Sequence, residues 1–469
     1  MHTTTFKLAA LLFLFLLLRT LTMKLFLPLL TLLSTFDVDT YSAPMTRKED
    51  INPYPDKPRL VFRKDGTFKI TIFSDQHFGE NPWDSWGPEH DASSINLMKT
   101  VLADEKPDYV STVPSGDMIT GENTFKENAT KLIDQIVAPL NTLKIPFSTT
   151  QGNHDNQNNI THLDIIKREQ AQAPLSYTRT SPPGVGGDKD DSDGDGVSRH
   201  GPGNCWVPIY QTQDAPSPSL ILWFFDSRGG FIDTNPWHPV PQDSASNGLK
   251  GADDWVHESV AGWIESEVGR MDAAWGAADA QGDGKGRAAL AFVHIPPHFA
   301  IDLQKNIDSG KEPGLNGAYA PVFVSPNLFY SYLLHFSAPA SHPPIMVLHP
   351  TMYYPADQLG SGSAQASNPS TIGKDGSFWN ALTGKVKNLK GVISGHDHGN
   401  EWCAREPTKK VIFCFDKHGG YGGYTQDGWG FGVRNLVFKS PKPDTEVDTW
   451  IRIEGGEEKA RIVLGPDYN

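Results

Sequence analysis

The chain has 469 residues, 38% of them hydrophobic and 10% aromatic, so it can bury a large core and is not wholly disordered. Its formal net charge is −14 and it has no basic run, so we expect no nucleic-acid partner. Three cysteines are too few for a disulfide-rich scaffold or for a zinc module built on four thiolates.

The N-terminus has the pattern of a targeting segment. Two apolar runs, residues 8–18 and 25–33, are separated by Arg19 and Lys24, and small residues follow the second run. A basic start, a short apolar centre and a small-residue end are typical of a secretory signal, and neither run reaches the ~20 residues of a membrane span. We therefore expect residues 1–43 to be a signal peptide and the mature chain to lack a stable membrane span. A retained N-terminal anchor is the alternative.

Other features also favour the secretory pathway, and hence an extracellular or vacuolar location. Asn128 and Asn159 each begin an Asn-x-Thr sequon, the acceptor for an N-linked glycan. Cys403 and Cys414 flank a turn-like segment, so two antiparallel strands could place their sulfur atoms opposite each other. We predict a disulfide there, with two unpaired core cysteines as the alternative and Cys205 left over.

Residues 44–57 read as a polar linker, and the apolar runs and turns that follow predict one domain over residues 58–469. Residues 60–73 read as a hairpin, and the spacing of apolar residues predicts a helix over 253–271. The segment 181–204 is an acidic loop. Its aspartates imitate the start of an EF-hand calcium loop, but proline occupies the twelfth position, so we expect a solvated loop.

Five strand-like runs lead directly into polar side chains. They cover residues 69–73, 109–113, 145–150, 290–293 and 392–394, and each is followed by Asp, Asn or His, often beside Gly. Loops at the carboxyl ends of strands carry the chemistry of α/β sheets, and a glycine there lets the backbone turn sharply so that a side chain points inward. We therefore predict an α/β (α+β) fold with its site at these strand ends.

The side chains at the strand ends are of the types that bind metals. Carboxylates and imidazoles are ligands for divalent and trivalent ions, and a lone carboxylate can bridge two ions ~3.5–4 Å apart. Two residues separated by two positions project to the same side of an extended segment. This spacing relates Asp75 to His77 and His396 to His398. The strand ends together offer Asp75, His77, Asp117, Asn153, His154, His294, His396 and His398.

The ordered motifs Gly-Asp, Gly-Asn-His-Asp and Gly-His-Asp-His-Gly resemble those of the calcineurin-like metallophosphoesterase superfamily, over about residues 60–438. Within it the chain looks most like the purple-acid-phosphatase-related branch, especially its fungal secreted or vacuolar phosphatases. Residues 292–296, 395–398 and the Gly-rich segment 419–429 carry this closer resemblance. It implies a β-sandwich of two mixed sheets flanked by helices, with a dinuclear metal site at the strand ends.

The resemblance also implies a role for each site residue. His154 would lie near the phosphate and protonate the leaving group or stabilise the transition state, and Asp155 would orient it. Asp117 would bridge the two metals. The first metal would be held by Asp75, His77, Asp117 and His398, and the second by Asp117, Asn153, His294 and His396.

One departure from the family pattern concerns the metals. Purple acid phosphatases carry a tyrosine three residues after the bridging aspartate, and its bond to iron gives the colour. Here that position is Thr120, while His77 keeps the ligand count because it stands where those enzymes have a non-ligand. A ferric first site is therefore not required, and we expect two divalent or trivalent ions drawn from Fe, Mn and Zn.

The resemblance implies metal-dependent hydrolysis of phosphate esters. It favours a secreted phosphomonoesterase, in which two metals lower the pKa of a bound water and the resulting metal-bound hydroxide attacks in line. The substrate would be a phosphorylated small molecule or a phosphoprotein. The alternatives are a phosphodiesterase or pyrophosphate hydrolase on the same site, and a non-catalytic secreted binding protein. The sequence indicates no oligomeric state.

Four further polar residues stand out in the sequence. His298 is a substrate contact or a solvent-facing loop residue, and His418 could line the mouth of the site and bind substrate. His349 also follows an apolar run and rivals His294 as a ligand, although the family pattern favours His294. Asp226, at the end of another apolar run, reads as structural.

Residues 313–356 contain no Asp, Glu, Lys or Arg, which is unusual in a chain that is 20% charged. We predict that about residues 317–356 are an insertion outside the working fold, such as a translated intron. The alternative is an apolar lid over the metal site. Residues 1–22, ahead of a self-sufficient signal, could be a similar overextension.

Overall fold

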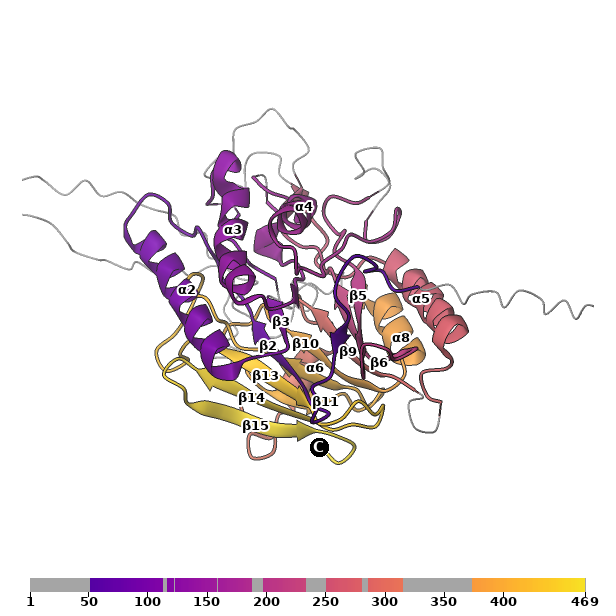
Figure 1. Cartoon of the computed structure of the whole chain (residues 1–469). Helices are drawn as coiled ribbons and strands as arrows, with labels where there is room; N and C mark the ends of the chain where they lie inside the picture. Colours follow the sequence, from indigo (N-terminus) through magenta and orange to yellow (C-terminus); the bar gives the residue numbers. More distant parts are fainter. Residues whose placement is uncertain are drawn as a thin grey trace, which may run out of the picture. The chain divides into compact units, whose positions relative to one another are not determined.

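The computed structural model describes residues 51–112, 116–121, 123–157, 159–187, 197–232, 250–280, 286–314 and 373–468 (Figure 1). The predicted signal peptide, the centre of the acidic loop and the uncharged insertion lie outside these residues, as does His349. Among the helices of the described part, none is both long enough and apolar enough to cross a membrane.

Two mixed β-sheets form the centre of the domain, as the resemblance implied. The first sheet has the strand order β1-β5-β6-β9-β10-β12-β11 and the second the order β15-β14-β13-β2-β3-β4. The first comprises β1 (Leu60–Val61), β5 (Cys205–Tyr210), β6 (Pro218–Phe225), β9 (Ala288–Val293), β10 (Leu389–Ser394), β11 (Cys403–Arg405) and β12 (Ile412–Phe415). The second comprises β2 (Phe68–Phe73), β3 (Tyr109–Thr112), β4 (Phe147–Ser148), β13 (Gly432–Phe438), β14 (Val447–Ile453) and β15 (Glu458–Leu464).

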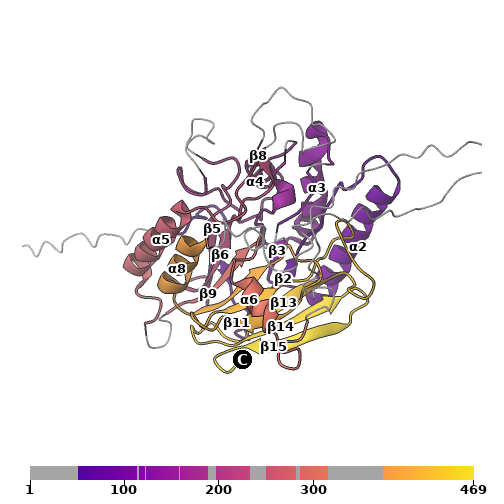
Figure 2. The ribbon, with the colours of Figure 1, turned by 180° about the vertical axis from the view of Figure 1, so that it is seen from behind.

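Helices cover the outer faces of both sheets (Figures 1 and 2). The described helices are α2 (Trp86–Glu105), α3 (Lys126–Leu143), α4 (His162–Gln172), α5 (Ser259–Trp275), α6 (Ala300–Lys305) and α8 (Gly376–Lys385), with a single 3₁₀ turn, η1 (Asn153–Asp155). A two-stranded ribbon, β7 (Phe231–Ile232) and β8 (Lys250–Gly251), completes the described elements.

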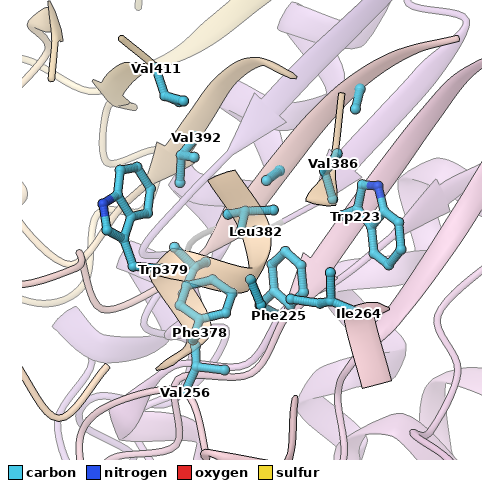
Figure 3. Close-up of a cluster of buried hydrophobic side chains, with 14 of the residues drawn as sticks. Trp223, Phe225, Val256, Ile264, Phe378, Trp379, Leu382, Val386, Val392 and Val411 are labelled. Atoms are coloured by element: carbon cyan, nitrogen blue, oxygen red, sulfur yellow. The ribbon is translucent and has the colours of Figure 1, made fainter. Parts of the chain in front are cut away.

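Strand β6 shows why the sheets are covered on both faces. Its eight residues are all buried, and successive side chains point to opposite faces of the sheet. Leu222 and Phe224 enter the core between the two sheets, whereas Trp223 and Phe225 pack outward against α5 and α8, as Figure 3 shows. A strand that is apolar on both faces requires a second layer on each side, which the opposite sheet and the two helices provide.

The outer face of the second sheet is covered in the same way by α2 and α3. Val101 of α2 and Ile133 and Val137 of α3 are buried against Val110 of β3. Full burial of such a side chain contributes about 1.5–3 kcal/mol relative to its exposure to water. Packing on both faces therefore holds the strands whose ends carry the predicted ligands.

The predicted strands at residues 69–73, 109–113, 145–150, 290–293 and 392–394 are confirmed as β2, β3, β4, β9 and β10, with β4 shorter than expected. The hairpin prediction was wrong. β1 pairs with β5 in the first sheet, while β2 lies between β3 and β13 in the second. β2 is buried along its whole length, so it takes a central position rather than an edge.

Two boundaries also differ from the predictions. Helix α5 begins at Ser259, because Arg228 holds the preceding segment by donating to the Trp255 carbonyl at 2.9 Å and to Asp253 Oδ2 at 3.1 Å. Residues 51–57 are not a free linker. Tyr54 is buried, and its hydroxyl donates to the Tyr177 carbonyl at 2.6 Å.

The predicted disulfide is present. β11 and β12 are antiparallel, and their register places Cys403 opposite Cys414. The two sulfur atoms are bonded, and Cys205 is free and buried. The bond joins two strands between the His396–His398 motif and His418.

Candidate metal centre

The loops that follow five parallel strands converge on one site. β2, β3 and β4 are parallel neighbours in the second sheet, and β9 and β10 are parallel neighbours in the first. Their loops bring together two groups of side chains whose ligand atoms lie within 4.8 Å of one another in each group. The first group is Asp75, His77 and His398, and the second is Asp117, His294 and His396.

In the first group two imidazole nitrogens face each other. Nε2 of His77 lies 3.2 Å from Nε2 of His398, which lies 3.6 Å from Asp75 Oδ1. Nδ1 of His398 donates to the Tyr424 carbonyl at 2.6 Å, so its Nε2 carries the lone pair. The Thr120 hydroxyl, 3.2 Å from Nδ1 of His77, can hold that ring in the same tautomer.

The second group gathers around His294. Its Nε2 lies 3.0 Å from Asn153 Oδ1, 3.2 Å from Asp117 Oδ2 and 3.2 Å from Nδ1 of His396. Asp117 Oδ2 also lies 3.8 Å from Nε2 of His77 in the first group. One carboxylate therefore lies between two clusters of nitrogen and oxygen donors.

The backbone at the site adopts conformations that are rare outside glycine. Asp75, His77, Asp117 and His396 have φ values of 49°, 48°, 55° and 70°. Non-glycine residues in this left-handed region cost of order 1–3 kcal/mol each and persist where the surroundings determine them. Here the flanking strands and the neighbouring loops hold four predicted ligands in this conformation.

Gly116 explains how two ligand loops can touch. It has a φ of +68°, and a Cβ atom there would come within 2.1 Å of the Gly152 Cα and 2.6 Å of the His294 Cγ. Gly152 is equally confined, since a Cβ on it would lie 2.3 Å from the Asp117 amide nitrogen. Glycines at both positions therefore allow the Asp117 and Asn153 loops to pack in direct contact.

Burial sets the protonation of the donors. It lowers the pKa of His77 and His398 well below the usual value and that of His396 to about 3, so these imidazoles are neutral. Burial, with the nearby carboxylates Asp117 and Asp416, raises the pKa of Asp75 well above its usual value. Neutral imidazoles and crowded buried carboxylates form a donor set that a multivalent cation would stabilise.

The loop after β4 is tied to Asp117. The main-chain N–H of His154 donates to Asp117 Oδ1 at 2.7 Å, and the Asp155 carboxylate accepts the N–H groups of Gly152 at 2.9 Å and Ile119 at 3.0 Å. The ring of His154 is partly exposed, and its centre lies 5.0 Å from that of His77. His154 is thus beside the first group.

Family comparison agrees with this geometry. Residues 68–264, which include β2, β3, β4 and the first four ligand positions, match the family model described as calcineurin-like phosphoesterase. This segment of the chain belongs to the calcineurin-like metallophosphoesterase family.

This metallophosphoesterase has distant curated relatives. Phosphatase DCR2 of Saccharomyces cerevisiae is 23% identical over 410 residues, which cover 86% of this chain and 56% of the relative. Probable inactive purple acid phosphatase 29 of Arabidopsis thaliana is 23% identical, with 86% of this chain and 87% of the relative covered. Probable inactive purple acid phosphatase 14 of the same plant is 24% identical, with 84% and 83% covered.

Among solved structures, GAP50, described as the anchor in the inner membrane complex of Plasmodium, aligns with 85% of this chain and 89% of its own at 10% identity. The TM-score is 0.36, which is too low to support a conclusion.

The two predicted substrate contacts of this metallophosphoesterase have different surroundings. His298 is partly buried, with 29% of its side chain exposed, and Asp375 accepts both its main-chain N–H at 2.9 Å and its Nδ1–H. His418 has no exposed surface. Its Nδ1 donates to the His398 carbonyl at 2.7 Å and its ring stacks on that of His398, a position that does not fit the predicted substrate contact.

Sequence reasoning missed the part that Tyr424 plays in supporting the metallophosphoesterase site. Its ring stacks on His398 with centroids 4.0 Å apart, and its hydroxyl accepts the His398 N–H at 3.0 Å and donates to the His396 carbonyl at 3.3 Å. The signal available was the Gly-rich segment around it. Gly423 lies so close to His77 and His398 that a Cβ would come within 2.7 Å of both rings.

Proposed function

We propose that this protein hydrolyses phosphate esters, with phosphomonoesters as the preferred class, at a centre of two metal ions. The observation that supports this best is the position of Asp117, within 3.2 Å of His294 in one donor group and 3.8 Å of His77 in the other. When bound, the two metal ions would supply Lewis-acid stabilisation of the phosphoryl oxygens and activate the attacking water.

The donor types suit Fe, Mn or Zn in both positions. Asp75, His77, Asp117 and His398 would hold the first ion, and Asp117, Asn153, His294 and His396 the second. Thr120 supports His77 through its hydroxyl and has no phenolate to offer iron. We therefore expect the purified protein to lack the visible tyrosinate-to-iron band of purple acid phosphatases, whichever of these metals it contains.

His154 is the group we assign to proton transfer. Its main chain is fixed on Asp117 and its partly exposed ring lies beside that of His77, so the ring can reach a bound ester and give a proton to the leaving group. Asp155 would act in support by holding the loop. His298, oriented by Asp375, would contact the phosphate or the leaving group.

We also propose that the protein passes through the secretory pathway to an extracellular or vacuolar location. The Cys403–Cys414 disulfide supports this, because such bonds persist in oxidising compartments. Of the two sequons, Asn128 is exposed on α3 and suits a glycan. Peptide mapping of protein secreted from a eukaryotic host tests both the removal of residues 1–43 and the glycan.

The test of the activity compares three substrate classes on purified, metal-analysed protein: an aryl phosphomonoester, an aryl phosphodiester and pyrophosphate. We expect two metals per chain and fastest hydrolysis of the monoester, with loss of both in Asp117→Asn. Asp134→Asn, at a partly exposed ion pair with Arg168 on the outer helices, is the matched control and should behave as wild type. Preference for the diester or pyrophosphate would move the assignment to those classes.

A protein that binds two metals and hydrolyses none of the three would be a binding protein instead. This outcome matters because both of the plant relatives described above carry the word inactive in their names. The complete donor set within the described chain favours catalysis.

A further inference from the structure

His162 is a fully buried histidine outside the donor groups, at the first residue of α4. Its Nδ1 lies 3.0 Å from both oxygens of Asp226, and its Nε2 lies 2.8 Å from the carbonyl oxygen of Gly152. Asp226 follows β6, which is parallel to β9, so Asp226 and His294 lie at the same end of the first sheet. His162 therefore connects the end of one sheet with the ligand loop after β4 of the other.

Both partners of His162 accept hydrogen bonds and neither can donate one in its usual state. The Gly152 carbonyl has no proton. Asp226 accepts the N–H of Arg228 through Oδ1 at 2.8 Å and that of Gly203 through Oδ2 at 3.0 Å, as an ionised carboxylate does. Both nitrogens of the imidazole must therefore carry protons, which makes His162 a cation.

The charge is unexpected from the local sequence. A cation at the start of a helix is disfavoured, because the helix dipole is positive there. Burial alone would lower the pKa of His162, but attraction and hydrogen bonding from Asp226, with a further contribution from Asp155, raise it above the ordinary value. The neighbouring His200 is the opposite case, since burial and the charge of His162 lower its pKa to about 4.

Gly152 lies immediately before Asn153, so its carbonyl oxygen belongs to the peptide group that leads into the donor. On one side of this peptide group the N–H of Gly152 donates to the Asp155 carboxylate, and on the other the N–H of His154 donates to Asp117. The Gly152 carbonyl also accepts the main-chain N–H of Asp155 at 3.1 Å. The bond from His162 links this carbonyl to Asp226, which follows β6 of the first sheet. We propose that His162, kept as an imidazolium by Asp226, is a positioning residue that sets the place of Asn153 in the second donor group.

This inference rests on the proposed metal centre but not on its chemistry. The first test measures the protonation state of His162 in the metal-free wild-type protein by ¹⁵N NMR of labelled imidazoles. We expect both nitrogens of His162 to be protonated at pH 7, above the ordinary histidine pKa of about 6.5. This signal should disappear in His162→Gln and shift in Asp226→Asn. A His162 signal with one unprotonated nitrogen at pH 7 would overturn the proposal.

The second test titrates the metal-free proteins with Zn²⁺ in a calorimeter. We expect His162→Gln and Asp226→Asn to lower the affinity for the second equivalent of Zn²⁺ about 10–100-fold, the range typical of residues that orient a metal ligand. His200→Gln is the matched control, because it removes a buried neighbouring imidazole that bonds Asn156 rather than Gly152. This variant should leave the affinity for both equivalents of Zn²⁺ unchanged.

Folded His162→Gln protein that binds both equivalents like wild type would refute the positioning role, even if its melting temperature were lower. Should that variant fail to fold, Asp226→Asn and the wild-type NMR experiment still decide the matter. Neither readout needs phosphatase activity. A protein that passes both tests and hydrolyses no ester would refute the proposed function and leave this inference standing.

Discussion

Asp117 accepts the main-chain N–H of His154 at 2.7 Å through the oxygen that does not face His294. One carboxylate therefore holds the loop that carries the proposed proton donor and, with its other oxygen, enters the second donor group. The position of His154 and the proposed metal centre therefore depend on the same side chain.

From this relationship we expect Asp117→Ala to lose both metals and all activity, because one carboxylate serves two cations. Elemental analysis of the purified variant measures the loss, and circular dichroism checks that the fold is retained. Two metals per chain in the folded variant would contradict the bridging role.

His154→Ala should keep both metals and lower kcat by about 10²–10⁴-fold, the usual contribution of a general acid. The main-chain bond to Asp117 remains in the variant, so the metal groups stay in place. An ester with a very good leaving group needs less protonation and should lose less rate. Equal losses on esters with good and poor leaving groups would remove the acid role from His154.

The His298–Asp375 pair should make stability depend on pH. Hydrogen bonding to Asp375 raises the pKa of His298 above its ordinary value of about 6.5. The stabilisation is therefore fully present below about pH 6.5 and is lost as pH rises through the higher folded-state pKa. The difference in Tm between wild type and His298→Gln should be largest near pH 6 and shrink in alkaline solution.

The control for this prediction is the same comparison in an Asp375→Asn background, where the carboxylate charge is absent. There the effect of His298→Gln should no longer change with pH. A difference in Tm that is constant across the range in the wild-type background would show that the pair does not titrate as described.

The two sequons should differ in use. Nδ2 of Asn159 donates to the carbonyls of Thr124 at 2.6 Å and Gly121 at 3.2 Å, so its amide is occupied within the fold, whereas Asn128 is exposed. In protein from a eukaryotic secretory host, Asn128→Gln should remove the glycan mass. Asn159→Gln should leave that mass unchanged and cost about 1–3 kcal/mol of stability, the worth of two hydrogen bonds. A glycan found on Asn159 would contradict this.

Much of the candidate site could be predicted because its motifs are local. A buried strand followed by Gly-Asp or Gly-Asn-His identifies the position where the chain leaves the sheet, and the converging loops agree with this reading for Asp117 and Asn153. The hairpin prediction failed for β1 and β2, because the choice of strand partner depends on which faces must be buried rather than on the turn between them.

The sequence by itself determined the family, the five strands that lead into the donors and the chemical type of each donor, since these depend on residues that are neighbours in the chain. Only the tertiary structure decided which nitrogen of each imidazole faces the site and which side chains support it. Nε2 of His77 meets Nε2 of His398 across 321 positions, and the tautomer of His398 is set by the carbonyl of Tyr424. The charge assigned to His162 depends on Asp226 and Gly152, two acceptors that the fold places on either side of its ring. Hydrogen-bond partners brought from distant positions fix protonation and orientation, and no local pattern carries that information.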